Sequence, residues 1–279
     1  MQSKLYTKTY GALLGQKHST EYGLKMTGCS ITYPEPNRIQ RKVPYGPVLD
    51  FTEALLEDVP YQQRTLEMTF DYTGGYLDFE QAMQELANDI HGQRMEIVLD
   101  FDPWYCYAGV PSVSRVKENK VDADVAITVA ADPYKLERFG STGQWLWDAL
   151  PFDGGVIRNY VDIPVNTSQD VLDLMGLSTG SASSLSAATH VVIPGSRKRV
   201  APKFITSETG LIAVAWWGPN QEAIPGTRPK KSASLQGLTW LPDMMIGPGE
   251  NHLYLLAANT SDIPGITVPV TIDYRGGIL

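Results

Sequence analysis

The spacing of hydrophobic positions predicts one amphipathic helix near the middle of the first half of the chain. In the segment LDFEQAMQELANDIHG, residues 77–92, apolar side chains recur at intervals of three and four: Phe79, Met83, Leu86 and Ile90. Asp78 occupies the N-cap position with Gln81 three residues later, and Gly92 can adopt the left-handed conformation that ends a helix. These signals predict a helix of about three turns with a defined start and end.

Around this helix the spacing changes to two, which predicts strands. Apolar and polar residues alternate over residues 65–72, 95–101 and 124–129, and Glu118-Asn119-Lys120 has the composition of a hairpin turn. A shorter strand is expected at residues 29–33. One helix packed on an antiparallel sheet is an α+β arrangement, and it ends at Asp132-Pro133-Tyr134.

The second half contains strand-sized apolar runs separated by turns, without a helix of this kind. The runs cover residues 190–193, 202–206, 211–217, 234–240, 252–258 and 266–274. This spacing predicts a β-sandwich, with Pro269 favouring an edge position for the last strand. Residues 148–188 are rich in Gly and Ser and are interpreted as a loop-rich insertion. We therefore predict a mainly β protein with domains at residues 1–140 and 141–279.

Charge and composition exclude several functional classes. The chain carries a net charge of −8, and residues 1–140 hold 14 basic and 20 acidic side chains, which argues against binding nucleic acid through its phosphates. No apolar run approaches the length of a membrane span, and the N-terminus lacks the apolar stretch of a signal peptide, so we expect a soluble protein made in a cytosol. Cys29 and Cys106 have no metal-ligand spacing and are expected to be free, buried thiols.

The sequence predicts no catalytic set, metal site or cofactor. The four histidines, His18, His91, His190 and His252, are scattered. His91 is expected to interact as a cation with the C-terminal end of the helix dipole. Asp100 and Asp102 share a strand face and could form a glycosidase-type carboxylate pair or a calcium site, but no further ligands are near in sequence, so a solvated edge is favoured.

Aromatic residues provide the only candidates for ligand binding. Trp104, Tyr105 and Tyr107 are interpreted as a cover for the end of the core rather than a ligand platform. Exposed tryptophan rings can stack on sugars, so the candidate carbohydrate-binding residues are Trp216, Trp217 and Trp240. Residues 211–217 are, however, apolar on both strand faces, which favours burial of the first two rings. The basic clusters at 197–199 and 228–231 are interpreted as solvated loops or a protein contact.

Several segments together resemble the distal tail proteins, called Dit, of long-tailed bacteriophages that infect Gram-positive bacteria. The matching segments are VPYGPVLDFTEAL followed by Tyr61-Gln62-Gln63-Arg64, the helix ending Ile90-His91-Gly92, DFDPWYCYAGV, Asp132-Pro133-Tyr134, GLTWLPDMMIGPGENHLYLLA and the terminal IDYRGGIL. The resemblance covers nearly the whole chain in the same order. It departs from the family at residues 148–188, which are longer and richer in Ser and Gly.

The resemblance implies a structural virion protein at the phage tail tip, made in the host bacterial cytoplasm. It implies an N-terminal domain similar to tail-tube proteins that forms a homo-hexameric ring, and a C-terminal galectin-like β-sandwich. The implied partners are the tail-tube protein, the tail-tip hub or tail-associated fibre protein and the receptor-binding protein, with DNA passing through the lumen. An acidic lumen would repel phosphates. The alternative is a carbohydrate-binding module for host cell-wall attachment.

Overall fold

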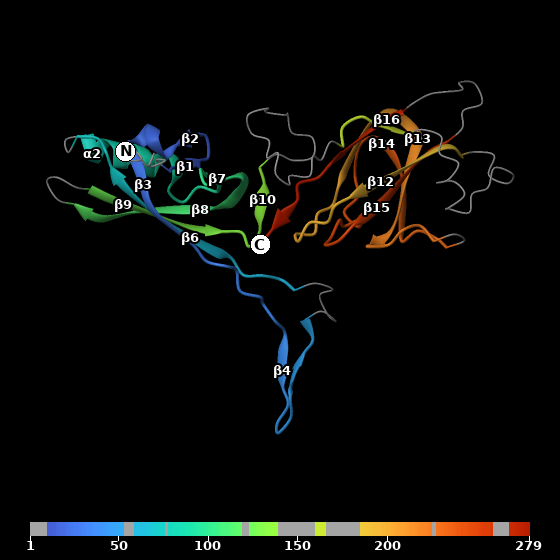
Figure 1. Ribbon diagram of the computed structural model, residues 1–279, viewed down its shortest axis with the longest axis horizontal. Coiled ribbons are helices and arrows are strands. Elements are labelled where there is room, and N and C mark those ends of the chain that lie inside the picture. The colour runs from blue at the N-terminus through green and yellow to red at the C-terminus, as the bar shows by residue number, and fades with distance from the viewer. Residues whose placement is uncertain are drawn as a thin grey trace, which may run out of the picture. The chain divides into compact units, whose positions relative to one another are not determined.

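The chain forms two compact units, residues 1–138 and 139–278, shown in Figure 1 with the first in blue to green and the second in yellow to red. The computed structural model describes residues 10–52, 59–75, 78–118, 123–138, 160–165, 185–224, 227–258 and 268–279. Strands dominate both units, which confirms the prediction of a mainly β protein. The predicted turn at residues 118–120 and most of the predicted insertion at 148–188 lie outside the described residues.

The first unit is one antiparallel sheet with a helix on its apolar face. Its elements are β1 (Ala12–Leu14), β2 (Lys17–His18), the 3-10 helix η1 (Ser19–Tyr22), β3 (Leu24–Ile31), β4 (Gln40–Lys42), β5 (Val48–Asp50), β6 (Arg64–Tyr72), α2 (Phe79–Ile90), β7 (Met95–Leu99), β8 (Asp102–Glu118), β9 (Ala123–Ala131) and β10 (Lys135–Glu137). The sheet runs in the order β2-β1-β7-β8-β9-β6-β3, and β10 pairs with the start of β8. The helix and the alternating strands are thus confirmed.

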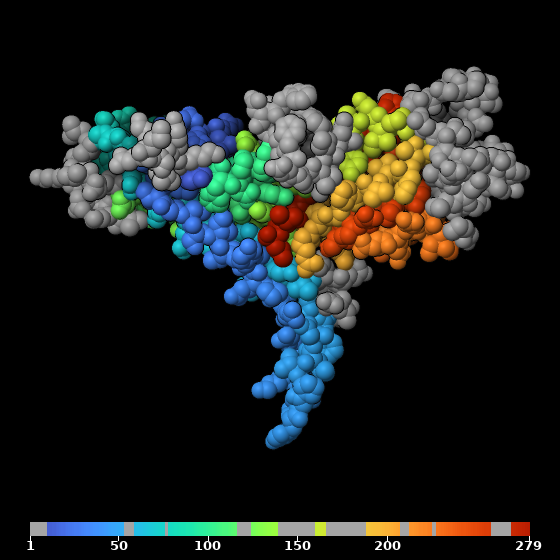
Figure 2. All heavy atoms as spheres, in the orientation of Figure 1, coloured from blue at the N-terminus to red at the C-terminus, as the bar shows by residue number. Residues whose placement is uncertain are grey.

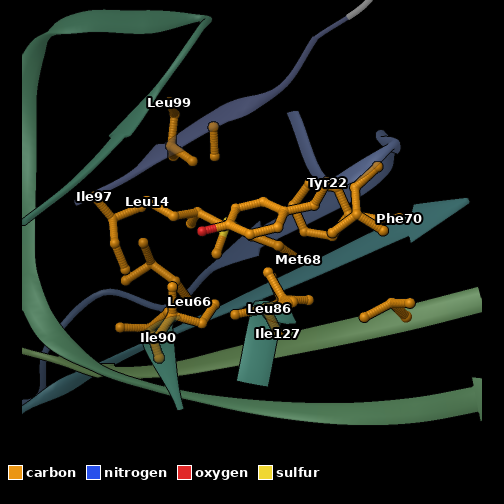
Figure 3. Close-up of a cluster of buried hydrophobic side chains, with 14 of the residues drawn as sticks. Leu14, Tyr22, Leu66, Met68, Phe70, Leu86, Ile90, Ile97, Leu99 and Ile127 are labelled. Atoms are coloured by element: carbon orange, nitrogen blue, oxygen red, sulfur yellow. The ribbon is translucent and has the colours of Figure 1, made fainter. Parts of the chain in front are cut away.

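The core of this unit follows from the alternation of its strands. In β6 the side chains of Leu66, Met68 and Phe70 are fully buried, whereas those between them point to solvent. The four apolar residues of α2 pack on this face, where they meet Leu14, Tyr22 and Ile127 (Figure 3). Helix and strands therefore share a single hydrophobic core.

The N-terminal end of α2 differs from the prediction, whereas the C-terminal signal agrees with it. Asp78 stands at the N-cap, but its backbone is helical, with φ −95° and ψ −8°, and its side chain makes no capping hydrogen bond. A helical backbone turns the carboxylate away from the free N–H groups, so the predicted capping box with Gln81 is absent. Gly92 does adopt a positive φ, 74°, as predicted.

The second unit is built on one long strand that pairs on both of its sides. Its strands are β11 (Ile163–Val165), β12 (Leu185–Ile193), β13 (Lys203–Pro219), β14 (Lys231–Trp240), β15 (Asn251–Ala258), β16 (Val268–Asp273) and β17 (Gly277–Ile278). The predicted runs 202–206 and 211–217 are both parts of β13, which pairs with β16 through its first part and with β15 through its second. The other predicted runs correspond to separate strands.

This sheet curls until its two edges meet. The order is β11-β16-β13-β15-β12, with β14 on the other side of β13. The Tyr160 hydroxyl donates to Val192 O (3.0 Å), and the Thr189 hydroxyl donates to Pro164 O (2.9 Å). These bonds bring β12 against the β11 edge. The buried residues of one sheet face form the main core, and a smaller cluster that includes Trp217 and Tyr254 is buried on the other face.

The prediction that Pro269 places the last strand at an edge is wrong. β16 lies between β11 and β13. Pro269 stands opposite Pro164 of β11, while the pairing of β16 with β13 ends at Val270. A proline has no N–H to donate, and here its partner in register also has none, so the ladder tolerates it inside the sheet.

Candidate interaction surfaces

A two-stranded arm, residues 33–52, extends from β3 and β6 and exposes apolar side chains. Its strands β4 and β5 pair at Gln40–Asp50 and Lys42–Val48, and the arm is the blue hairpin at the bottom of Figures 1 and 2. Tyr45 is fully exposed, and the exposed fractions of Tyr33 and Val48 are 83% and 55%. Exposed apolar side chains on a projecting hairpin are typical of a surface that another protein covers.

The outer part of the arm is also basic. Residues 36–49 contain Arg38, Arg41 and Lys42 and no acidic residue. At its base, Asp50 accepts hydrogen bonds from the hydroxyl and backbone of Thr52 and from Gln40 and Arg38, and these bonds hold the pKa of the Asp50 carboxyl well below its usual range. The base of the arm is therefore fixed by polar bonds, while its tip is left apolar and positive.

Two of the segments that carry the family resemblance meet where the arm joins the sheet. The Tyr61 and Tyr134 rings pack edge to face, with centroids 6.0 Å apart, and Tyr61 bridges to Pro36 of the arm. Arg64 is 3% exposed, donates from Nε to Pro133 O (3.0 Å) and places its guanidinium 5.6 Å from the Tyr107 ring centroid. The resemblance at these positions thus corresponds to the anchoring of the arm.

A groove runs between helix α2 and strand β8. It has a volume of about 620 Å³ and a mixed lining, in which Met83, Ala87 and Val113 are apolar and Glu80, Gln81, Gln84, Ser114 and Arg115 are polar. The Arg115 guanidinium donates to both carboxylate oxygens of Glu80 within it (2.7 Å for Nη1–Oε1). Along this part of β8, β9 pairs with one edge of the strand. The groove lies beside the other edge, where no described strand pairs.

The outer face of β3, β6 and β9 is polar and acidic. The face carries three carboxylates, from Glu67, Asp71 and Asp124, among serine and threonine side chains. Among the described residues of these strands, Lys25 is the basic side chain on this face. Asp71 stands directly opposite Asp124, an arrangement that destabilises a sheet. Lys25 of β3 stands opposite Asp71 on its other side, so part of this repulsion is offset within the sheet.

The three candidate tryptophans do not form one site. Trp216 and Trp217 are 2% and 6% exposed, and Trp217 Nε1 donates to the Thr227 hydroxyl (3.0 Å). Trp240 is 61% exposed on β14, beside Leu238 and opposite Lys203 of β13. The core interpretation therefore holds for the first two rings, and only the third can present a face to a ligand.

Asp100 and Asp102 do not form a carboxylate pair. Asp100 accepts from the Gly11 backbone (2.7 Å) and contacts His18 (3.1 Å), whereas Asp102 pairs with Lys135 (2.7 Å). Each carboxylate has its own partner because the chain turns back between them, with β7 ending at Leu99 and β8 beginning at Asp102. The residues that the structure describes include no cluster of three or more potential metal ligands.

His91 stands at the C-terminal end of α2 and also makes a structural hydrogen bond. Its Nδ1 accepts a hydrogen bond from the Val113 backbone N–H (3.1 Å). This contact, which the sequence did not predict, involves a backbone group of a distant strand. The bond ties the end of α2 to β8.

A histidine pair in the second unit escaped the sequence analysis. His190 Nε2 and His252 Nδ1 are 3.0 Å apart, and the His190 ring stacks on Tyr254 with centroids 4.6 Å apart. Burial and the neighbouring His252 lower the pKa of His190. Their spacing of 62 residues carries no signal, and only the pairing of β12 with β15 brings them together.

Comparison with protein-family models and with curated proteins gave no match to the sequence. Comparison with solved structures matches the fold to that of phage tail-end proteins. The crystal structure of SPP1 Dit, described as a paradigm of the hub adsorption apparatus in Gram-positive infecting phages, matches with a TM-score of 0.55 and 10% identity over 98% of this chain and 100% of that chain. A chain of the phage p2 baseplate, in its activated conformation with Sr, matches with a TM-score of 0.41 and 11% identity over 95% and 97%.

The likeness to SPP1 Dit confirms, at the level of the fold, the resemblance read from the sequence. It extends over nearly all of both chains, so it includes both units. Within the described ranges, no helix is both long and apolar enough to cross a membrane.

Proposed function

We propose that this protein is a structural hub of a phage tail end, without catalytic activity. In this proposal its first unit forms a homo-hexameric ring that joins the tail tube to the tail-tip and receptor-binding proteins, and its second unit is a galectin-like domain on the ring. The observation that carries the proposal is the likeness to SPP1 Dit, a hub protein, over the full length of both chains. The exposed apolar arm supports it, because such an element needs a partner to cover it.

The acidic face of β3, β6 and β9 fits the wall of a DNA channel. Phosphates are repelled by carboxylates, so DNA would slide past Glu67, Asp71 and Asp124 without sticking. The opposition of Asp71 and Asp124 places two carboxylates next to each other on this face, which adds to its negative charge.

The channel is tested by charge reversal. We expect Glu67→Lys with Asp71→Lys to make assembled rings retain linear DNA in a gel-shift assay at low salt, whereas the wild type should not retain it. Replacement of Gln84 and Asn88 by lysine, on the exposed surface of α2, is the control for added positive charge away from this face. Equal retention by both variants would contradict the assignment of the acidic face to the channel.

The hub proposal is tested by mass and by imaging. Native mass spectrometry of the full chain, alone and with the tail-tube protein, should show a species of six copies, and negative-stain images should show rings. A protein that stays monomeric in both conditions over the micromolar range would contradict the proposal.

A carbohydrate-binding role remains the alternative, and the exposure of Trp240 favours it. A ring that is 61% exposed beside the polar Lys203 can stack on a sugar and leave hydrogen-bonding groups within reach. Titration of the full chain with cell-wall glycans should quench Trp240 fluorescence, and Trp240→Ala should remove that change. Quenching that persists in the variant, or its absence in the wild type, would exclude this site.

A further inference from the structure

The outer side of strand β14 changes from polar to apolar halfway along the strand. Leu235 of this strand is fully buried, so the side chains at even-numbered positions point away from the core. In chain order these outward residues are Ser232, Ser234, Gln236, Leu238 and Trp240. The exposed fraction is 69% for Leu238 and 61% for Trp240, so two large apolar side chains stand next to each other on the outer face of the sheet.

The neighbouring strand β13 continues this apolar surface. Ile205 stands directly opposite Leu238, and Lys203 stands opposite Trp240. Ile205 is 43% exposed, so it adds a third apolar side chain to the surface. The Cβ atoms of Leu238, along the same strand, and of Ile205, on the diagonal, lie about 7 Å from that of Trp240. The indole ring therefore has two aliphatic neighbours close enough for one small ligand to touch all three.

Polar groups border this surface on the side of β16. Asp273 stands opposite Lys203, so a cation and a carboxylate lie in the same row as Trp240. An ammonium group offers three hydrogen-bond donors, and a carboxylate offers acceptors. The row thus presents an aromatic face next to groups that can both donate to a hydroxyl and accept from one.

This combination suits a sugar better than a protein. Three apolar side chains are too few for a stable protein interface, which buries about 800 Å² on each partner. A sugar ring has an apolar face that stacks on an indole and hydroxyl groups at its edge that need donors and acceptors. A hydroxyl placed against Leu238 and Ile205 would lose its hydrogen bonds, whereas a methyl group there would gain apolar contact. The acetamido group of an N-acetylated sugar carries such a methyl group.

We propose that Trp240, Leu238 and Ile205 form a binding site for an N-acetylated hexosamine. The sugar ring stacks on the indole, the acetamido methyl group lies on the two aliphatic side chains, and the ring hydroxyls face Lys203 and Asp273. The proposal rests on the alternative, carbohydrate-binding role and names the class of sugar. It is independent of the ring that the first unit would form.

Two oligosaccharides test the proposal on the full chain. Chitotetraose and cellotetraose differ only in one substituent of each sugar ring, which is acetamido in the first and hydroxyl in the second. Isothermal titration calorimetry should give a Kd for chitotetraose at least about tenfold lower than that for cellotetraose. Trp240→Ala should abolish binding of both.

A double variant separates the preference for the acetamido group from stacking. Leu238→Ser with Ile205→Ser keeps the indole and should reduce the preference for chitotetraose to below about threefold. Val192→Ser, at a side chain on β12 that is 39% exposed, is the matched control and should retain the full preference. All four side chains are exposed, so these substitutions should leave the protein folded.

The outcomes distinguish this site from the carbohydrate-binding role as a whole. Equal affinity for the two oligosaccharides, lost in Trp240→Ala, would overturn the preference for an N-acetylated sugar and leave the carbohydrate-binding role in place. Chitotetraose binding that persists in Trp240→Ala would overturn the assignment of the site. If neither oligosaccharide binds and cell-wall glycans also fail to bind, both the site and the carbohydrate-binding role are wrong.

Discussion

Strand β6 and the arm before it have similar apolar content but use it in opposite ways. In β6 the apolar residues Leu66, Met68 and Phe70 are fully buried, whereas in the arm Tyr45, Val48 and others face solvent. The difference is that β6 has a helix over its apolar face and the arm has no second layer of described residues. Apolar residues of β6 stabilise the monomer, and those of the arm are available for association.

The largest effect is expected in β6. Phe70→Ala should lower the free energy of unfolding by about 3–5 kcal/mol, because the change leaves a cavity between the sheet and α2. Urea denaturation followed by circular dichroism measures this loss. Thr69→Ala, on the solvent face of the same strand, is the control and should change the value by less than about 0.5 kcal/mol. Equal effects of the two substitutions would show that α2 does not cover this face.

A smaller loss is expected where the arm joins the sheet. Arg64→Met keeps most of the aliphatic stem of the side chain but leaves Pro133 O without its guanidinium donor, which should cost about 1–3 kcal/mol. Arg94→Met, at an exposed ion pair with Asp132 close by, is the control and should cost less than about 1 kcal/mol. If both variants lose the same free energy of unfolding, the buried hydrogen bonds to Pro133 stabilise the protein no more than the exposed ion pair does.

The second unit offers a test that depends on pH. Because the pKa of His190 is lowered in the folded state, the unfolded chain takes up a proton first as the pH falls. The stability from the neutral pair is thus fully present above about pH 6.5 and is lost as the pH falls below it. His190→Gln should reduce this dependence, measured by denaturation at pH 7.5, 6.5 and 5.5, whereas His18→Gln should leave it in place. An unchanged pH dependence in His190→Gln would exclude the pair as its source.

The sequence predicted the elements whose spacing is regular. Helix α2 and strand β6 follow directly from the intervals between apolar residues, and the burial of Phe79 and Phe70 confirms them. Phe101 shows the limit of that reasoning, since alternation from Met95 placed it in the core but it is 48% exposed. A hairpin turn between Leu99 and Asp102 ends the strand first, and local spacing does not reveal a turn that short.

The candidate surfaces were less accessible to sequence reasoning because they depend on which strands become neighbours. The groove beside β8 exists because the pairing of β7 with β8 ends at Met95 and Gly109, whereas β9 pairs with β8 as far as Glu118. No local pattern in the sequence records that difference. The apolar residues of the arm have no regular period, so their spacing predicts no strand there. One signal in the sequence could have identified the arm: residues 36–49 include three basic residues and no acidic residue.

The smallest effect on the stability of the monomer is expected at the tip of the arm. A change there separates monomer stability from assembly. Tyr45→Ser removes a fully exposed ring, so the free energy of unfolding of the monomer should change by less than about 0.5 kcal/mol. If the arm contacts another subunit, the same change should raise the concentration needed for ring formation by at least about tenfold, as measured by mass photometry, because a buried tyrosine contributes strongly to an interface. Tyr10→Ser, at a half-exposed ring outside the arm, is the control. Unchanged assembly in Tyr45→Ser would mean that the tip of the arm has no partner in the ring, and its apolar surface would then have to meet a different tail protein.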